Sequence, residues 1–300
     1  MSSMLDIKTH LKRTLQRTTV PDTVVRLIEG ARGIRHPETL IGRLNFPPPP
    51  HGEGGVLVFA AHQDDEVLGL GSTLAKHRSR GDRVTVVFTT NGAGANWKES
   101  NAAKRAISAV RFQEACDALA VISIDAAEII CLGFPDGGLH RYIPEASDDI
   151  ATLIRTIVPH TIYVHAMEGG HLDHDVTAFV VQEVSARLLI ERVFEWAEYN
   201  SEARGGQPLA DARFASDPYV PDFDCAPTPF DQSEFTSKQQ MLAKYASQAV
   251  SIRYYPFCSE ILRKARPIHL LPRLAHFTRM SHRRLRSLIG EHPARDERQR

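Results

Sequence analysis

The chain of 300 residues has little cysteine and no long apolar run. Its four cysteines are widely spaced and form no C-x-x-C pair, which argues against a disulfide framework and against a cysteine-rich zinc site. No stretch approaches the roughly 18 to 20 apolar residues of a membrane span. The N-terminal MSSMLDIKTHLKRTLQ carries charges where a secretory signal needs an apolar core. We therefore expect a protein of the reducing cytoplasm.

The chain also lacks net charge, because 36 Lys and Arg balance 36 Asp and Glu. A global footprint of nucleic-acid binding is therefore absent. The charge is uneven, however: residues 251–300 contain twelve basic and four acidic residues, an excess of eight. Their mixture of arginine with leucine, phenylalanine and isoleucine is compatible with contact to a membrane surface. We prefer the alternative interpretation, a solvated cationic face packed on the domain.

A dinucleotide-binding G-x-G-x-x-G after the first predicted strand is missing as well. What is present is an alternation of apolar strands with helical patterns. The strands are predicted at 56–61, 83–89, 127–132, 161–165 and 192–199, and the helices at 68–80, 100–120, 147–158 and 174–190. Such alternation predicts an α/β fold with a Rossmann-like, mainly parallel sheet covered by helices on both faces.

Composition divides the chain into four predicted segments. Residues 1–45 contain two helical patterns, Met4–Arg17 and Pro21–Arg32, and form an N-terminal helical extension. FPPPPHGEGG, which ends at residue 55, is a linker because proline and glycine exclude helix and central strand. Residues 56–265 form the main domain, and 266–300 a basic C-terminal tail with helical character.

The second half of the main domain is less regular. Residues 200–235 show little periodicity, and a loop of this length is usually functional or disordered. Helical patterns resume at 236–250 and 258–266. Pro267 and Pro272 are expected to interrupt the tail.

Two clusters of histidine and carboxylate carry the chemistry. HQDDE (62–66) follows the first predicted strand, and MEGGHLDHD (167–175) follows the fourth. With 14 histidines, one H-x-x-H pair alone is weak evidence. Two clusters at the carboxyl ends of parallel strands are stronger, because those ends meet at one edge of a sheet.

Residue types in the clusters suit a catalytic metal. Two imidazoles and one carboxylate leave zinc a fourth position for water, whose pKa then falls to around 7. A further carboxylate is needed as general base. Asp64 and Asp65 are adjacent and would face opposite ways on a continuing strand, so they can serve one site only if the strand has ended and the backbone turns there.

AHQDDE (61–66) followed by GGHLDHD (169–175) resembles the LmbE/PIG-L family of zinc-dependent N-deacetylases, whose motifs are A-H-P-D-D-E and H-P-D-H. The resemblance covers about residues 55–265. It includes the LGFPDGGL segment (132–139) and further matches at Arg111, Glu114, Lys238, Ser247 and Gln248. It implies one zinc ion per chain and a small-molecule substrate that carries an N-acetylated amino sugar.

The resemblance also implies a role for each matching residue. The zinc ligands would be His62, Asp65 and His174. Asp64 would be the general base, and His171, oriented by Asp173, would stabilise the oxyanion. Arg111 and Asp136 would contact the sugar, and Glu66 would fix the turn.

Two departures and several alternatives accompany these assignments. Gln63 and Leu172 replace the family prolines, and we expect Gln63 to make a polar contact at the mouth of the site. Asp136 lies in P-D-G, which forms a turn by itself. Arg111 could instead pair with Glu114.

The aromatic residues of the fifth predicted strand need a separate interpretation. Phe194, Trp196 and Tyr199 are expected to pack rather than to form a platform for a sugar.

The expected activity is hydrolysis of an acetamide. Alternatives are an amidase on another N-acyl bond, a two-metal phosphoesterase, and a sugar-binding module without catalysis.

Overall fold

The computed structural model describes residues 22–31, 55–94, 100–198, 213–220, 225, 227–252 and 259–290. The chain divides into two compact units, Met1–Ile34 and Arg35–Arg300. In the first unit, helix α2 (Asp22–Ala31) confirms the helix predicted over Pro21–Arg32. The helix predicted over Met4–Arg17 lies outside the described residues, as does most of the predicted linker.

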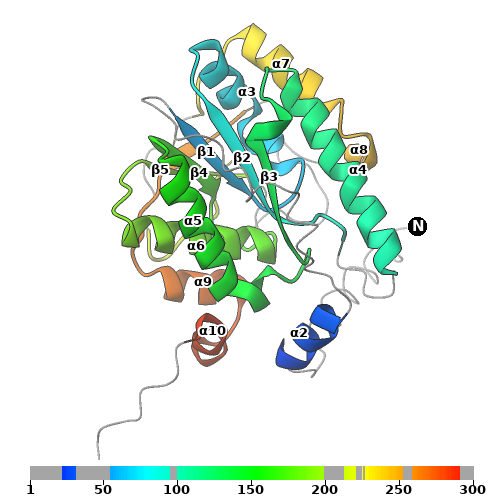
Figure 1. Cartoon of the computed structure of the whole chain (residues 1–300). Helices are drawn as coiled ribbons and strands as arrows, with labels where there is room; N and C mark the ends of the chain where they lie inside the picture. Colours follow the sequence, from blue (N-terminus) through cyan, green and yellow to red (C-terminus); the bar gives the residue numbers. More distant parts are fainter. Residues whose placement is uncertain are drawn as a thin grey trace, which may run out of the picture. The chain divides into compact units, whose positions relative to one another are not determined.

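The second unit is built on a six-stranded sheet of order β3-β2-β1-β4-β5-β6 (Figure 1). Its strands are β1 (Val56–Ala60), β2 (Val84–Thr90), β3 (Ile129–Phe134), β4 (Thr161–His165), β5 (Val193–Trp196) and β6 (Leu262–Lys264). All neighbours pair in parallel except β5 and β6. The predicted mainly parallel sheet is therefore confirmed.

Helices cover both faces of the sheet. In β1, the side chains of Leu57 and Phe59 enter one apolar core, whereas Val56 and Val58 enter the other. This follows from the alternation of side chains along a strand that is buried on both sides.

The helices divide between these two cores. The first core receives α5 (Ile143–Ile157), α6 (Leu172–Arg187), α9 (Leu270–Thr278) and α10 (His282–Ile289). The second receives α3 (Asp65–Ser79), α4 (Asn101–Ala120), α7 (Gln232–Leu242) and α8 (Ala249–Ile252). Short 3-10 turns lie at Ala126–Glu128, Leu139–Tyr142 and Ala246–Gln248.

Two expectations for the last third of the chain are wrong. The helix predicted at 258–266 is instead the antiparallel edge strand β6, whose three residues are too few to show a strand period. Pro272 does not interrupt the tail but lies in the first turn of α9, where its missing N–H costs no helical hydrogen bond.

The basic C-terminal segment packs on the domain. Leu274 of α9 and Leu285 of α10 are fully buried in the core that also holds α5 and α6. Apolar side chains of this segment therefore contact protein. Within the described residues, no helix has the length and apolar character needed to cross a membrane.

Sheet order places the two motif-bearing strands side by side. β1 pairs with β4, and both run in the same direction. The chain leaves β1 into α3 and β4 into α6, so both helices begin at the same edge of the sheet. In open α/β sheets this edge is where ligands bind, at the point where strand order reverses.

Candidate metal centre and catalytic site

The turn between β1 and α3 has an unusual backbone. Asp64 has φ 136° and ψ −30°, a conformation that residues with a side chain rarely adopt. The main-chain N–H of His62 donates to Asp65 Oδ2 at 2.7 Å, and that of Asp64 donates to Glu66 Oε2 at 3.1 Å. The strand has thus ended and the backbone turns here, which allows the carboxylates of Asp64 and Asp65 to serve one site.

The second cluster lies at the start of α6. His171 is the N-cap residue, and its Nδ1 accepts a hydrogen bond from the Asp173 N–H at 3.2 Å. His174 follows in the first turn and is buried. Asp175 accepts hydrogen bonds from the N–H groups of Glu168 and Gly169, which fixes the loop before the helix.

Three of the predicted ligand atoms form a nearly equilateral triangle. His62 Nδ1 lies 3.3 Å from Asp65 Oδ2, His174 Nε2 lies 3.2 Å from Asp65 Oδ2, and the two histidine nitrogens lie 3.3 Å apart. In a tetrahedron with the usual zinc bonds of about 2.0 to 2.1 Å, ligand atoms lie about 3.3 to 3.4 Å apart. The residues therefore fit a tetrahedral zinc ion with one open position.

Other donors surround this triangle. Ligand atoms also come within 4.8 Å of one another in three overlapping groups: His62, His171 and His174; His62, Asp136, His171 and Asp173; and Asp65, His165, His174 and Glu198. None of these groups contains the predicted triad as a whole. We retain the triad because its three mutual distances match one coordination sphere.

The carboxylates of the turn differ in their protonation. Burial opposes ionisation of Asp65, but the charges of His174 and His62 outweigh it and hold its pKa well below the usual range. Burial raises the pKa of Asp64 to about 7, although Arg111 opposes this rise. Asp65 is thus anionic, whereas Asp64 can accept a proton near neutral pH.

His171 stays neutral for a related reason. Burial, followed by the charge of His62, lowers its pKa to about 4. Because its Nδ1 accepts the Asp173 N–H, the proton of the neutral ring is on Nε2. His171 is therefore a neutral hydrogen-bond donor.

Arg111 contacts the proposed base directly. Its guanidinium donates to Asp64 Oδ1 at 3.0 Å, to the Gln63 carbonyl at 2.7 Å and to the Gly92 carbonyl at 3.1 Å. Glu114 accepts hydrogen bonds from Ser247 instead. The alternative ion pair between Arg111 and Glu114 is therefore wrong.

Asp136 and Asp173 both face His62. Each places a carboxylate oxygen 3.4 Å from His62 Nε2. Asp136 also accepts the Gly94 N–H at 2.8 Å, so it does more than form a turn. Asp173 accepts the N–H groups of Gly137 and Leu139, and it contacts His171 through its own main-chain N–H. Its carboxylate is thus placed to orient His62.

The expectation for Gln63 is wrong. Its side chain is fully buried rather than at the mouth of the site. Its amide donates to the Thr90 carbonyl at 3.2 Å, at the end of β2. Gly92 fits against it closely, since a Cβ at Gly92 would lie 2.0 Å from Gln63 Oε1. The buried amide of Gln63 thus joins the turn to the end of β2.

Comparisons with known proteins agree with this geometry. The family described as "PIG-L: GlcNAc-PI de-N-acetylase" matches residues 57–185. Residues 57–185 form a PIG-L/LmbE family domain.

One curated relative of the PIG-L/LmbE domain is the 1D-myo-inositol 2-acetamido-2-deoxy-alpha-D-glucopyranoside deacetylase of Mycobacterium leprae (strain Br4923). The two chains are 28% identical over 183 residues, which cover 53% of this chain and 58% of the relative's length.

Two solved structures share the fold. A deacetylase triple mutant of the teicoplanin biosynthetic pathway has a TM-score of 0.55 at 20% identity and covers 70% of this chain and 98% of its own. The A40926 pseudoaglycone deacetylase has a TM-score of 0.52 at 23% identity and covers 66% and 84%. At these identities the likeness is one of fold.

Two buried residues near the PIG-L/LmbE site, His165 and Glu198, were not predicted as site residues. His165, at the end of β4, accepts the Ala61 N–H at 3.0 Å and stacks on the His174 ring with centroids 3.9 Å apart. Its other nitrogen lies 3.5 Å from Glu198 Oε2. The position of His165 at the end of a predicted strand beside β1 was the available signal. The ring of Trp196 is fully buried and contacts the ring of His165, so the packing role predicted for this aromatic residue is confirmed. Tyr199 lies outside the described residues.

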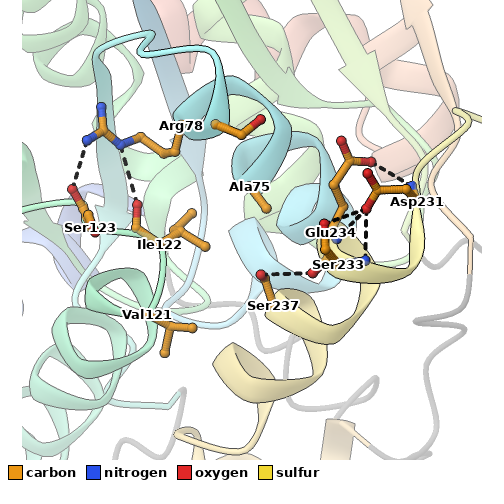
Figure 2. A pocket seen from close by; sticks show the side chains of 10 residues that line it. Ala75, Arg78, Val121, Ile122, Ser123, Asp231, Ser233, Glu234 and Ser237 are labelled. Carbon is orange, nitrogen blue, oxygen red and sulfur yellow. Dashed lines mark hydrogen bonds between the residues drawn. The ribbon is translucent and has the colours of Figure 1, made fainter.

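A cavity of about 480 Å³ lies away from the PIG-L/LmbE motifs, between the end of α3, the end of α4 and the start of α7 (Figure 2). Arg78, at its edge, lies 13 residues after Asp65, which is about 20 Å along a helix. The guanidinium already donates to the carbonyls of Ile122 and Ser123, and Asp231 caps α7. Arg78 and Asp231 thus already have partners within the protein, so the cavity is not the candidate site.

Proposed function

We propose that this protein is a zinc-dependent hydrolase that removes an N-acetyl or other N-acyl group from a small molecule containing an amino sugar. The observation that carries the proposal is the triangle of His62, Asp65 and His174 with Asp64 beside it. The family description and the name of the curated relative both denote de-N-acetylation of a glucosamine derivative, which supports the same reaction class.

His62, Asp65 and His174 would hold one zinc ion per chain. When bound, zinc supplies Lewis acidity, which polarises a carbonyl and lowers the pKa of nearby water.

Asp64 is the proposed base. Arg111 holds one of its carboxylate oxygens, and its pKa of about 7 suits proton removal from water near neutral pH. As the amide carbonyl becomes tetrahedral, the Nε2–H of His171 donates to the developing oxyanion. The oxygen of the deprotonated water forms the new bond to the carbonyl carbon. Collapse of the tetrahedral intermediate breaks the C–N bond, and the proton that Asp64 took from the water passes to the nitrogen, so that the free amine and acetate are released.

Asp136 is the better candidate for a contact to the sugar. The hydrogen bonds of Arg111 run to Asp64, Gln63 and Gly92, so this residue serves the base first. The carboxylate of Asp136 lies beside His62 and can accept a sugar hydroxyl. We propose a glycoside or natural-product intermediate as substrate.

Two other activities remain as alternatives. An amidase on a larger N-acyl group would use the same site, and a phosphoesterase would use two metals about 3.5 to 4 Å apart. The metal content per chain separates the deacetylase from the phosphoesterase. Close to one zinc supports the deacetylase, and two metals support the phosphoesterase. Release of acetate from any N-acetylamino sugar would exclude a sugar-binding module without catalysis.

The base is tested with Asp64→Asn in the zinc-loaded protein. The variant keeps the shape of the side chain but cannot accept a proton. Acetate release over a panel of N-acetylglucosaminides should fall roughly 10²- to 10³-fold, with zinc content unchanged. Asp117→Asn, at an exposed position of α4, is the control and should match the wild type. Normal turnover by Asp64→Asn would contradict the assignment.

A further inference from the structure

The backbone of Asp64 needs support from its surroundings. A residue with a side chain at φ 136° is strained and persists only where neighbouring contacts hold it. Arg111 holds the carboxylate of Asp64, and Glu66 holds its main-chain N–H. The second contact holds the main chain at the residue from which the carboxylate projects.

Glu66 is itself fixed by a distant residue. Its side chain is fully buried, and each carboxylate oxygen has a partner. Oε2 accepts the Asp64 N–H, and Oε1 accepts the hydroxyl of Tyr245, 179 residues along the chain. Tyr245 is 1% exposed, so its only side-chain polar atom is directed at Glu66 rather than at solvent.

Contacts on both sides of Tyr245 fix its position. On one side, the Lys238 ammonium donates at 2.8 Å to the Leu68 carbonyl of α3, the helix that starts at the catalytic turn. On the other side, Ser247 donates to Glu114 of α4, the helix that carries Arg111. Tyr245 is thus placed between contacts to the two helices that meet at Asp64.

We propose that Tyr245 is a positioning residue for the base. Its hydroxyl orients Glu66, and Glu66 keeps the Asp64 N–H, and with it the carboxylate, in the strained conformation that faces the metal centre. This role rests on the proposed function of Asp64. A tyrosine that only filled the core would be replaced by phenylalanine without effect on turnover.

The kinetic test uses the full zinc-loaded chain with Tyr245→Phe, which removes the hydroxyl and keeps the ring. Loss of an outer contact of this kind costs roughly 10- to 100-fold in activity, so kcat should fall by about tenfold or more. KM should stay within about twofold and zinc content should not change, because neither substrate nor metal ligands are touched.

Tyr163→Phe is the matched control, because its hydroxyl is bonded to His77 and not to the site. It should keep the wild-type kcat. If Tyr245→Phe keeps the wild-type kcat, or if both variants lose activity in proportion to their thermal stability, the proposal is wrong.

A second measurement does not depend on the substrate. The exchange rate of the Asp64 amide hydrogen reports the bond to Glu66, because local opening controls exchange. It should rise by about tenfold or more in Tyr245→Phe and remain unchanged in Tyr163→Phe.

A third variant tests the link through Glu66. Glu66→Gln offers one acceptor oxygen in place of two, so it should also speed exchange at Asp64. Unchanged exchange in both Tyr245→Phe and Glu66→Gln overturns the proposal. If exchange is faster in the variants but the wild-type protein releases no acetate, the positioning contact is supported and the proposed function is wrong instead.

Discussion

At the scale of single residues, the guanidinium of Arg111 joins three acceptors on two segments of the chain. It contacts the Asp64 carboxylate and the carbonyls of Gln63 and Gly92. A lysine has a single ammonium and cannot span all three with the geometry of a planar fork. We expect Arg111→Lys to lower kcat roughly 10- to 100-fold, with zinc content unchanged.

The control for this change is Arg105→Lys, an exposed position on the same helix. Acetate release by this control should equal that of the wild type. Arg111→Lys with wild-type turnover would show that the fork is not needed to hold Asp64.

Residue types and their spacing predicted much of the site but not the direction of each side chain. The resemblance carried by HQDDE and HLDHD implied the triad of His62, Asp65 and His174. The structure brings these residues together because both motifs follow parallel strands. The contact from the Gln63 amide to the Thr90 carbonyl depends on the pairing of β1 with β2, which is a tertiary property. The φ of 136° at Asp64 is likewise indicated by no local pattern of aspartates. The contact from His165 to His174 depends on the register of β4 beside β1, which is a tertiary property.

At the scale of elements, a buried ion pair joins α7 to the residues before β6, and both of its members contact helix α3. Lys238 and Glu260 are both fully buried and lie 2.8 Å apart. The lysine donates to the Leu68 carbonyl, and the glutamate accepts the Ser72 N–H at 2.7 Å. Each of these two main-chain groups contacts one member of the ion pair.

Removal of the lysine alone should destabilise the fold strongly. Lys238→Met leaves a buried carboxylate without its charge partner, which typically costs about 3 to 5 kcal/mol in the free energy of unfolding. We expect a decrease near the lower end of this range, because Glu260 still accepts hydrogen bonds from Ser72 and Thr73. Urea unfolding measures the change.

The double variant Lys238→Met with Glu260→Met is the matched test. It removes both charges, so neither charge is left buried without its partner. The free energy of unfolding should fall less in the double variant than in Lys238→Met alone. A loss equal to the sum of the two single changes would show that the charges do not act as a pair.

The same region shows the limit of periodicity. Long elements such as α4 and β2 were predicted from their patterns almost to the residue. β6 has only three residues, and neighbouring apolar residues gave it a helical pattern. Its pairing with β5 is long-range, so only the assembled sheet identifies it as a strand.

At the scale of the whole molecule, segments far apart in the sequence share buried charges. Arg273 of α9 is fully buried and pairs with Asp217, in the segment expected to be a long loop, and with Glu195 of β5. The basic excess of the C-terminal region is therefore partly neutralised by buried carboxylates of the domain.

Glu168 joins three segments in the same region and makes stability depend on pH. Its carboxyl group accepts the N–H groups of Glu198 and Ala215, both at 3.1 Å. Burial raises its pKa from 4.5 to about 8, against the opposing effect of these hydrogen bonds. Between these two values the folded protein keeps a proton that the unfolded chain has released. Stability from this group is therefore fully present below pH 4.5 and is lost as pH rises to about 8.

Glu168→Gln removes this dependence, since glutamine does not ionise. The variant loses one acceptor oxygen, so it should melt below the wild type at pH 5. The difference in Tm should shrink by roughly 2 °C or more by pH 8, because the wild type then must bury a charge. Thermal unfolding of both proteins at several pH values between 5 and 8 measures this. A difference that stays constant or widens with pH would show that Glu168 is already ionised in the folded protein.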